Sequence, residues 1–115
     1  MTRNKFSNRE ESNEHLFVIV STYRAKADQE DAIIALHEDW QRRQGLKGKV
    51  YLSWELLRNT EAPDEFIVIA HFESEELANA MANYLNQDAW CLRLVSLIEG
   101  GPSHKICVRE WHAPS

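Results

Sequence analysis

Two histidines and a tyrosine stand out as side chains that could carry chemistry. His37 falls on the apolar face of an expected helix, His71 interrupts an expected buried strand, and Tyr23 lies near the end of another strand. Histidine changes its charge near neutral pH, so it can act as a general acid or base. A tyrosine hydroxyl can hydrogen-bond a phenol or quinone oxygen. These three residues are the candidate catalytic residues.

Each candidate also has a purely structural interpretation. Core histidines with satisfied hydrogen bonds are more frequent than catalytic ones, and buried tyrosines are common. Burying His71 without a partner would cost about 1–3 kcal/mol, so we expect it to have one, in a substrate or across a dimer.

Aromatic residues could complete a substrate pocket around these candidates. Ser21 shares a strand face with Tyr23, and tryptophan rings could stack on a flat aromatic ligand, although core packing is their commoner role. The expected pocket residues are Ser21, Trp40, Trp54, Phe72 and Trp90.

Several kinds of site find no support in the sequence. The five histidines have neither the helical nor the strand spacing that builds a metal site, so we expect no metal ligands. There is no glycine-rich phosphate loop, no G-x-S-x-G motif and no pair of catalytic carboxylates. Hydrolase and nucleotide-binding functions are therefore unsupported, and no cofactor is expected.

Composition and charge narrow the class of protein. The 115 residues suit a single domain, 15–115, preceded by a flexible polar arm, 1–14. The net charge is −5 and no basic stripe alternates with aromatic residues, so neither nucleic acid nor a membrane is an expected partner. Cys91 and Cys107 lack disulfide-scaffold spacing, which favours reduced thiols and a cytoplasmic location; a disulfide between them is the less favoured alternative.

The elements that must position the candidates follow from the hydrophobic pattern. The segment 65–85 passes from a nearly continuous apolar strand to an amphipathic helix that Ser74 can cap. Asp28 and Asp88 are expected caps of two further helices, and Gly45 is an expected helix stop. We expect strands at 15–24, 49–58, 66–72 and 104–112, and helices at 28–44, 74–85 and 89–98.

The order β-α-β-β-α-β predicts an α+β fold of the ferredoxin-like, split-βαβ type. Its four-stranded antiparallel sheet would carry the helices on one face only. Yet the strands supply a second apolar face, comprising Leu16, Val18, Val20, Val50, Leu52, Trp54, Ile67 and Ile69. Such a patch marks an interface, so we expect a homodimer with the sheets face to face in a shared barrel. The alternative is a monomer whose arm, with Phe6 as its one aromatic, covers that face. Because the register of the second and third strands is open, Trp54 could belong to the pocket or to the interface.

Five short motifs occur in order along the chain: Tyr23 to Ala27, Ser53 to Arg58, Phe66 to Phe72, Glu73 to Ala78 and Asp88 to Trp90. On these motifs, residues 15–112 resemble the antibiotic biosynthesis monooxygenase family of dimeric α+β barrel proteins. The resemblance implies a cytoplasmic dimer with a hydrophobic pocket between sheet and helices. Some members oxidise aromatic polyketides or quinols with dioxygen and no cofactor, others degrade haem, and others process small signalling molecules.

The haem-degrading branch uses an asparagine, a tryptophan and a histidine at positions that correspond here to Ser21, Phe72 and Leu94. All three differ, and leucine cannot bind iron, so haem degradation is disfavoured. Three functions stay open. The first is a cofactor-independent monooxygenase or oxidoreductase for a small aromatic or quinol-like molecule. The second is a non-catalytic small-molecule-binding or structural dimer with a degenerate pocket. The third is a signal-molecule isomerase-like enzyme that uses His37 or His71 as acid and base.

Overall fold

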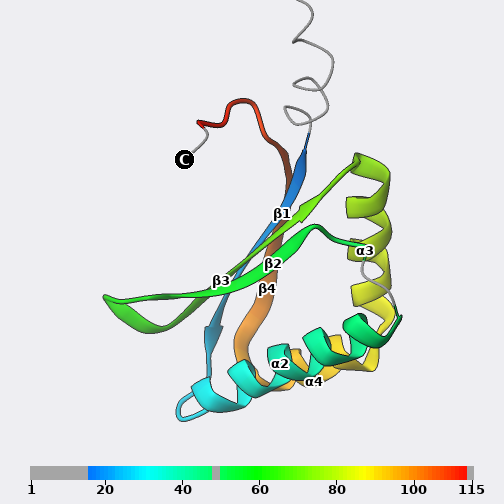
Figure 1. Ribbon diagram of the computed structural model, residues 1–115. Coiled ribbons are helices and arrows are strands. Elements are labelled where there is room, and N and C mark those ends of the chain that lie inside the picture. Colours follow the sequence, from blue (N-terminus) through cyan, green and yellow to red (C-terminus); the bar gives the residue numbers. More distant parts are fainter. Residues whose placement is uncertain (1–15, 48–49, 114–115) are drawn as a thin grey trace, which may run out of the picture.

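The chain folds into one antiparallel sheet with three helices on one side of it (Figure 1). The computed structural model describes residues 16–47 and 50–113. Its elements are β1 (Phe17–Ala25), α2 (Glu30–Lys47), β2 (Ser53–Asn59), β3 (Ala62–Phe72), α3 (Glu75–Gln87), α4 (Ala89–Leu97) and β4 (Ile98–Val108). The strand order is β2-β3-β1-β4, which confirms the ferredoxin-like fold. The expected arm, 1–14, lies outside the described residues.

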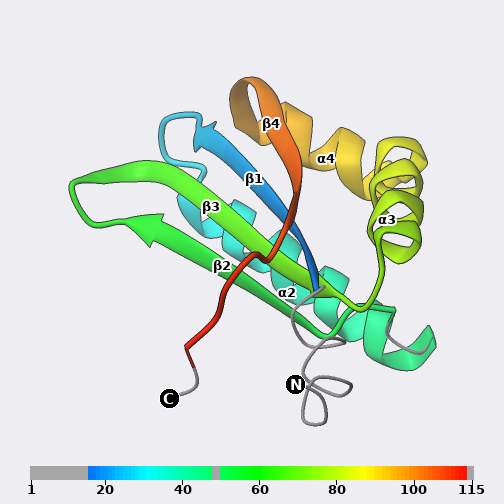
Figure 2. The ribbon, with the colours of Figure 1, turned by 90° about the horizontal axis from the view of Figure 1, so that it is seen from above.

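The two central strands form the base of the core. In the β1–β3 register Ser21 lies opposite Val68 and Tyr23 lies opposite Phe66, and these side chains face the helices. Successive residues of a strand point to opposite faces, so Val20 and Ile69, which also lie opposite each other, face away from the helices. Figure 2 shows the same arrangement from above, with α2 behind the sheet and α3 and α4 beside it.

Local capping chemistry places the second helical segment as expected. The Ser74 hydroxyl accepts a hydrogen bond from the Leu77 amide at 3.2 Å, and the Asp88 carboxylate accepts one from the Trp90 amide at 2.7 Å. Both side chains satisfy amide groups that have no partner inside their helix. The separate helices α3 and α4 therefore meet at Asp88, as the sequence indicates.

Two element boundaries differ from the expectation. Helix α2 begins at Glu30 and runs through Gly45, whereas Asp28, the expected cap, has a left-handed backbone with φ of 65°. Glycine inside a helix costs about 1 kcal/mol, which the packing of α2, buried as far along as Gln44, outweighs.

The last strand was expected at 104–112 but β4 starts at Ile98, directly after α4, and contains the Gly100-Gly101-Pro102 sequence expected to be a break. Edge strands tolerate proline because one side of their backbone needs no partner, and Gly100, with φ of 65°, can adopt the left-handed conformation that this bend requires. The buried side chain of Ile98 joins the core and explains why the strand begins there.

Of the residues expected on the second apolar face, Val50 and Leu52 lie outside the strands, and Trp54, which could belong to the pocket or to the interface, is on the helix side. Strand β2 begins at Ser53, so Val50 and Leu52 precede it and are about half exposed, at 45% and 51%. Trp54 lies opposite Ala70 and faces the helices, with its ring centroid 5.6 Å from that of Trp40.

No helix in the described part of the chain is both long and apolar enough to cross a membrane. The two cysteines are not bonded to each other: Cys91 is half-buried on α4 and Cys107 is exposed on β4.

Replacing Ser74 with alanine tests the cap of α3. The Leu77 amide would lose its acceptor, and we expect the free energy of unfolding to fall by about 1 kcal/mol, as measured by urea denaturation. Ser103→Ala, at an exposed position of β4, is the matched control and should change the free energy little. Equal effects of the two substitutions would contradict a capping role.

Candidate functional site

A hydrogen-bonded pair of side chains lies in the interior between sheet and helices. The Tyr23 hydroxyl on β1 meets Nε2 of His37 on α2, and the two rings are nearly parallel, with centroids 6.2 Å apart. Their residues are only 6% and 7% exposed. The structure thus brings together two of the three candidate catalytic residues.

Burial sets the protonation state of both groups. It lowers the pKa of His37 to about 4 and raises the pKa of Tyr23 well above its ordinary value. Both shifts arise because a low-dielectric interior disfavours the charged form of each group. At neutral pH the pair is uncharged, and the imidazole is in the form that can accept a proton.

Neighbouring aromatic rings hold the pair in place. The Trp90 ring meets His37 edge-on, with centroids 5.2 Å apart, and its indole N–H donates to the Leu36 carbonyl oxygen at 3.0 Å. Phe66 packs against Tyr23 with centroids 6.1 Å apart. Among the described residues, neither Nδ1 of His37 nor Nε1 of Trp54 has a hydrogen-bond partner, although both atoms are buried. A buried polar atom without a hydrogen-bond partner lowers the stability of the folded state.

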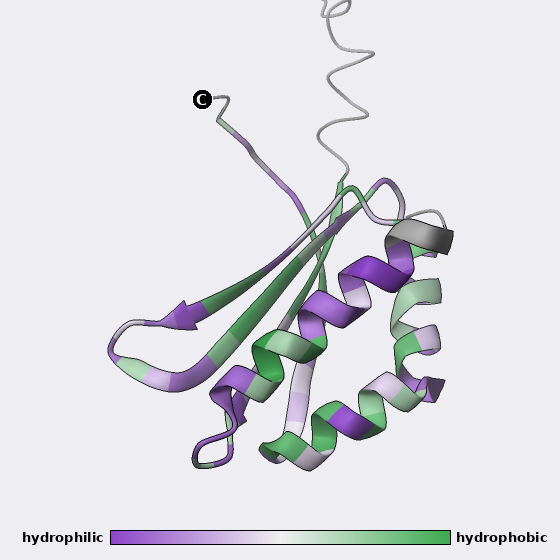
Figure 3. Cartoon of the chain, turned by 60° about the horizontal axis from the view of Figure 1, so that its bottom comes forward, coloured by the Kyte–Doolittle hydropathy of each residue, from purple (hydrophilic) through white to green (hydrophobic). Residues whose placement is uncertain are grey.

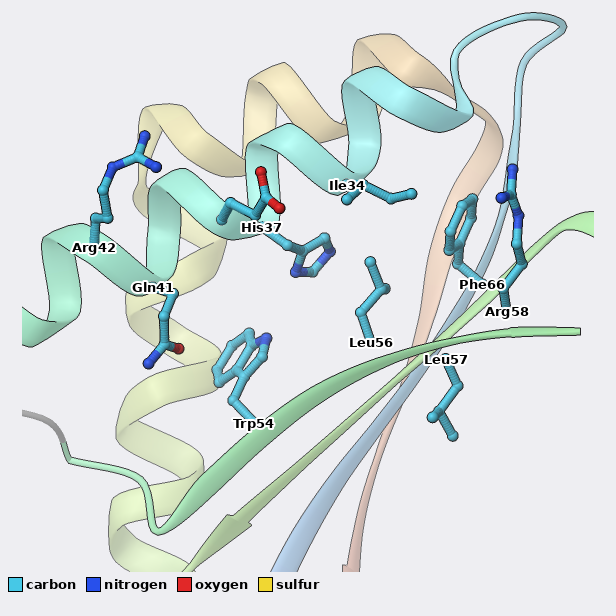
Figure 4. A pocket seen from close by; sticks show the side chains of 10 residues that line it. Ile34, His37, Gln41, Arg42, Trp54, Leu56, Leu57, Arg58 and Phe66 are labelled. Carbon is cyan, nitrogen blue, oxygen red and sulfur yellow. The ribbon is translucent and has the colours of Figure 1, made fainter.

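An open cleft of about 760 Å³ borders the pair between α2 and β2, and we call it the edge cleft (Figure 4). His37 and Ile34 point from the helix toward the sheet, and Trp54 and Leu56 point from β2 toward the helix. With Phe66 these side chains make its wall largely apolar, while Glu38, Gln41, Arg42 and Arg58 supply polar groups. The Tyr51 hydroxyl donates a hydrogen bond to Oε1 of Gln41 at 2.8 Å. This bond joins the segment just before β2 to α2. The cleft is large enough for a small organic ligand.

The space directly between sheet and helices, where the pocket was expected, is mostly filled. Trp40, Phe72 and Trp90 are 0%, 0% and 4% exposed and pack into the core. A residual space of about 30 Å³ remains, which we call the inner chamber. Such a volume holds one or two water-sized molecules. Of the five expected pocket residues, Ser21, Trp54 and Trp90 line this chamber, while Trp40 and Phe72 are core residues.

His71 lies apart from the other two candidates. It is opposite Val18 and Ser53 on the face of the sheet that turns away from the helices. Its Nδ1 lies 2.9 Å from the Ser53 hydroxyl, so the partner expected for it is supplied by the neighbouring strand. His71 and His37 therefore cannot act together on one bound molecule.

His104 is a residue that the sequence analysis did not single out. Its Nδ1 lies 2.7 Å from the Ser21 hydroxyl, it lines the inner chamber, and burial lowers its pKa. His104 and Ile106 are two residues apart, so the sequence indicates that they share a face of the last strand. Only their pairing with Ser21 and Ile19 of β1 shows that this face is the one toward the helices. Within the described part of the chain, no three histidine, cysteine or acidic side chains gather where they could hold a metal ion.

Comparison with known proteins identifies the family. The model of the antibiotic biosynthesis monooxygenase family matches residues 16–90. This chain belongs to the antibiotic biosynthesis monooxygenase family. No curated protein sequence matches it.

Solved structures of other proteins share its fold. A candidate antibiotic biosynthesis monooxygenase from Nitrosomonas europaea has a TM-score of 0.69 at 14% identity, over 83% of this chain and 90% of that one. A conserved protein from Methanosarcina mazei Go1 has a TM-score of 0.70 at 11% identity, over 85% and 96% of the two chains. A candidate antibiotic biosynthesis monooxygenase from Chloroflexus aurantiacus J-10-fl has a TM-score of 0.63 at 19% identity, over 86% and 97%. At these identities the likeness establishes the fold alone.

The lowered pKa of His37 makes stability depend on pH. As the pH falls below the ordinary value of 6.5, the unfolded chain binds a proton on this ring before the folded chain does, down to a pH of about 4. We expect this proton uptake by the unfolded chain to lower the free energy of unfolding by roughly 3 kcal/mol between pH 6.5 and about pH 4. His37→Gln has no imidazole to protonate at this position. Urea denaturation at about pH 7 and about pH 4.5 should therefore show a smaller decrease in the free energy of unfolding for the variant than for the wild type. Parallel losses in the two proteins would contradict a neutral buried His37.

Proposed function

We propose that this protein is a cofactor-independent oxidoreductase that oxidises a small aromatic or quinol-like molecule bound in the edge cleft. The observation that carries the proposal is the uncharged His37–Tyr23 pair at the inner side of a largely apolar cleft. Membership in the antibiotic biosynthesis monooxygenase family supports the reaction class. The two free cysteines support a reducing, cytoplasmic setting.

The first step is removal of a proton from the substrate. In the tautomer in which Nε2–H of His37 donates to the Tyr23 oxygen, Nδ1 is a bare acceptor that takes the proton from an acidic O–H or C–H group. Tyr23 then holds the protonated ring through that same hydrogen bond. The unpartnered N–H of Trp54 can donate to the substrate oxygen on which negative charge develops.

The resulting electron-rich anion reacts with dioxygen directly. For a substrate with a methylene group flanked by aromatic rings, the balance is R₂CH₂ + O₂ → R₂C=O + H₂O. Two C–H bonds and the O–O bond break, the carbon loses four electrons, and dioxygen takes all four. No external reductant is needed, so the residues of the cleft have only to bind, deprotonate and shield the substrate from water.

A second candidate function is non-catalytic binding of a small molecule. It is favoured by the filled interior, in which Trp40, Phe72 and Trp90 leave only the 30 Å³ chamber. In that case the edge cleft would bind a ligand without turning it over. An isomerase-like function would have to rely on His37 without His71, because the two lie on opposite faces of the sheet.

Oxygen uptake with a panel of anthrones and hydroquinones tests the proposed reaction. We expect His37→Gln to lower kcat by roughly 10²- to 10⁴-fold, because the proton acceptor is lost. Tyr23→Phe should lower it by about tenfold, which corresponds to one lost hydrogen bond.

His71→Gln is the matched control, because it changes a histidine on the other face of the sheet. It should leave turnover unchanged. Tight binding of a panel compound to the folded wild-type protein without any oxygen uptake would favour the binding function instead.

We also propose that the protein is a homodimer through the open face, defined by Val18, Val20, Leu57, Ile67 and Ile69. No helix of the described chain covers these side chains, and Figure 3 shows hydrophobic segments along the strands with the helices all on one side. Leaving them in water would cost on the order of 25 cal/mol per Å². A second copy offers the same apolar surface in a self-complementary arrangement.

Analytical ultracentrifugation at micromolar concentration tests the assembly. We expect the wild type to sediment as a dimer and Ile69→Glu as a monomer, because a charge would be buried without a partner. Leu92→Glu, at a position 74% exposed on α4, is the control and should remain dimeric. A folded wild-type monomer would rule out this interface and favour cover by the N-terminal arm.

A further inference from the structure

Three spaces follow one another across the sheet, beneath the helices. The edge cleft lies over β2, the inner chamber over β3 and β1, and a third space of about 210 Å³, which we call the β4 cavity, lies between β4 and helices α3 and α4. The chamber shares His37 and Trp54 with the edge cleft. It shares Ile19, Leu85, Trp90, Leu94 and His104 with the β4 cavity. The His37–Tyr23 pair therefore lines the inner chamber, and His37 also borders the edge cleft.

The sizes of these spaces separate the molecules that can enter them. The edge cleft, at about 760 Å³, is within the range of small-ligand sites. The inner chamber, at about 30 Å³, admits a molecule of one or two heavy atoms but no aromatic ring. Once an aromatic substrate fills the edge cleft, a second, smaller reactant has to approach the pair from the other side.

The walls of the β4 cavity suit an apolar molecule. Ile19, Leu94 and Ile106 contribute carbon surface, as does the ring of Trp90. The polar residues of its wall are Asn86, His104 and Lys105, and His104 is hydrogen-bonded at 2.7 Å to Ser21 of the inner chamber, which leaves these two side chains less able to hold water. A largely apolar wall holds water weakly and can take up an apolar gas.

We propose that dioxygen reaches the inner chamber through the β4 cavity, while the aromatic molecule occupies the edge cleft. The assignment of dioxygen as reactant rests on the proposed function; the cavity itself and its selection for small apolar molecules rest on its size and walls. The two reactants then meet at the His37–Tyr23 pair from opposite sides, and neither blocks the path of the other. Trp90 lines both the cavity and the chamber and packs against His37, so it lies where the route reaches the pair.

Dissolved dioxygen is paramagnetic, so methyl NMR of the full chain under oxygen pressure reports where it resides, without any need for turnover. We expect the methyl groups of Ile19 and Leu94 to relax several-fold faster under oxygen. Ile33, which is 0% exposed on α2 and borders none of the three spaces, is the internal control and should change little. Equal relaxation at Ile19 and Ile33, as a water-filled chamber would give, overturns the proposal.

Filling the cavity supplies the kinetic test. Ile106→Trp, at a position 37% exposed on the cavity wall, should raise the KM for dioxygen several-fold without changing the KM for the aromatic substrate, and should reduce the NMR effect at Ile19. Leu94→Trp blocks the route more deeply but alters a core position, so Ile106→Trp is the decisive variant. Leu92→Trp, exposed on α4, is the control and should change neither KM.

The outcomes separate the two proposals. Oxygen-induced relaxation at Ile19 without oxidation of any panel compound would leave the gas route standing and count against the proposed function. Oxidation with an unchanged KM for dioxygen in Ile106→Trp would uphold the function and overturn the route.

Discussion

The hydrogen bond between Tyr23 and His37 is the contact on which the rest of the site depends. It joins β1 to α2 across the buried interior, where either polar group alone would cost more than the bond contributes. Burial by Trp90 and Phe66 also removes the charged forms of both side chains. The same burial that makes the pair part of the core therefore keeps a proton acceptor neutral at physiological pH.

The shape of the interior follows from where the large aromatic rings lie. Trp40 is in contact with Trp54 and Trp90, with ring centroids 5.6 Å and 5.4 Å apart, and this cluster fills the middle of the layer between sheet and helices. Packing at crystal-like density leaves little room there. The larger remaining spaces lie toward the edge strands β2 and β4, one on either side of this cluster.

The parts of the fold that were predicted correctly depend on neighbours close in the chain. Ser74 and Asp88 cap their helices because each side chain reaches an amide two or three residues ahead. The errors involve competition between local preference and packing. Gly45 does not stop α2, and Gly100 and Gly101 lie inside β4, because burial of Gln44 and Ile98 outweighs the local tendency of glycine to end an element.

The sequence by itself determined the order of the elements, the Ser74 and Asp88 caps of α3 and α4, the two apolar faces of the central strands and the shared face of Ser21 and Tyr23. Only the tertiary structure decided that His37 meets Tyr23, that His104 meets Ser21 and that His71 lies on the far face of the sheet. Periodicity and capping act over a few residues and can be seen in the sequence directly. The pairing of His104 with Ser21 spans 83 residues and depends on strand register and helix docking, which no local pattern specifies.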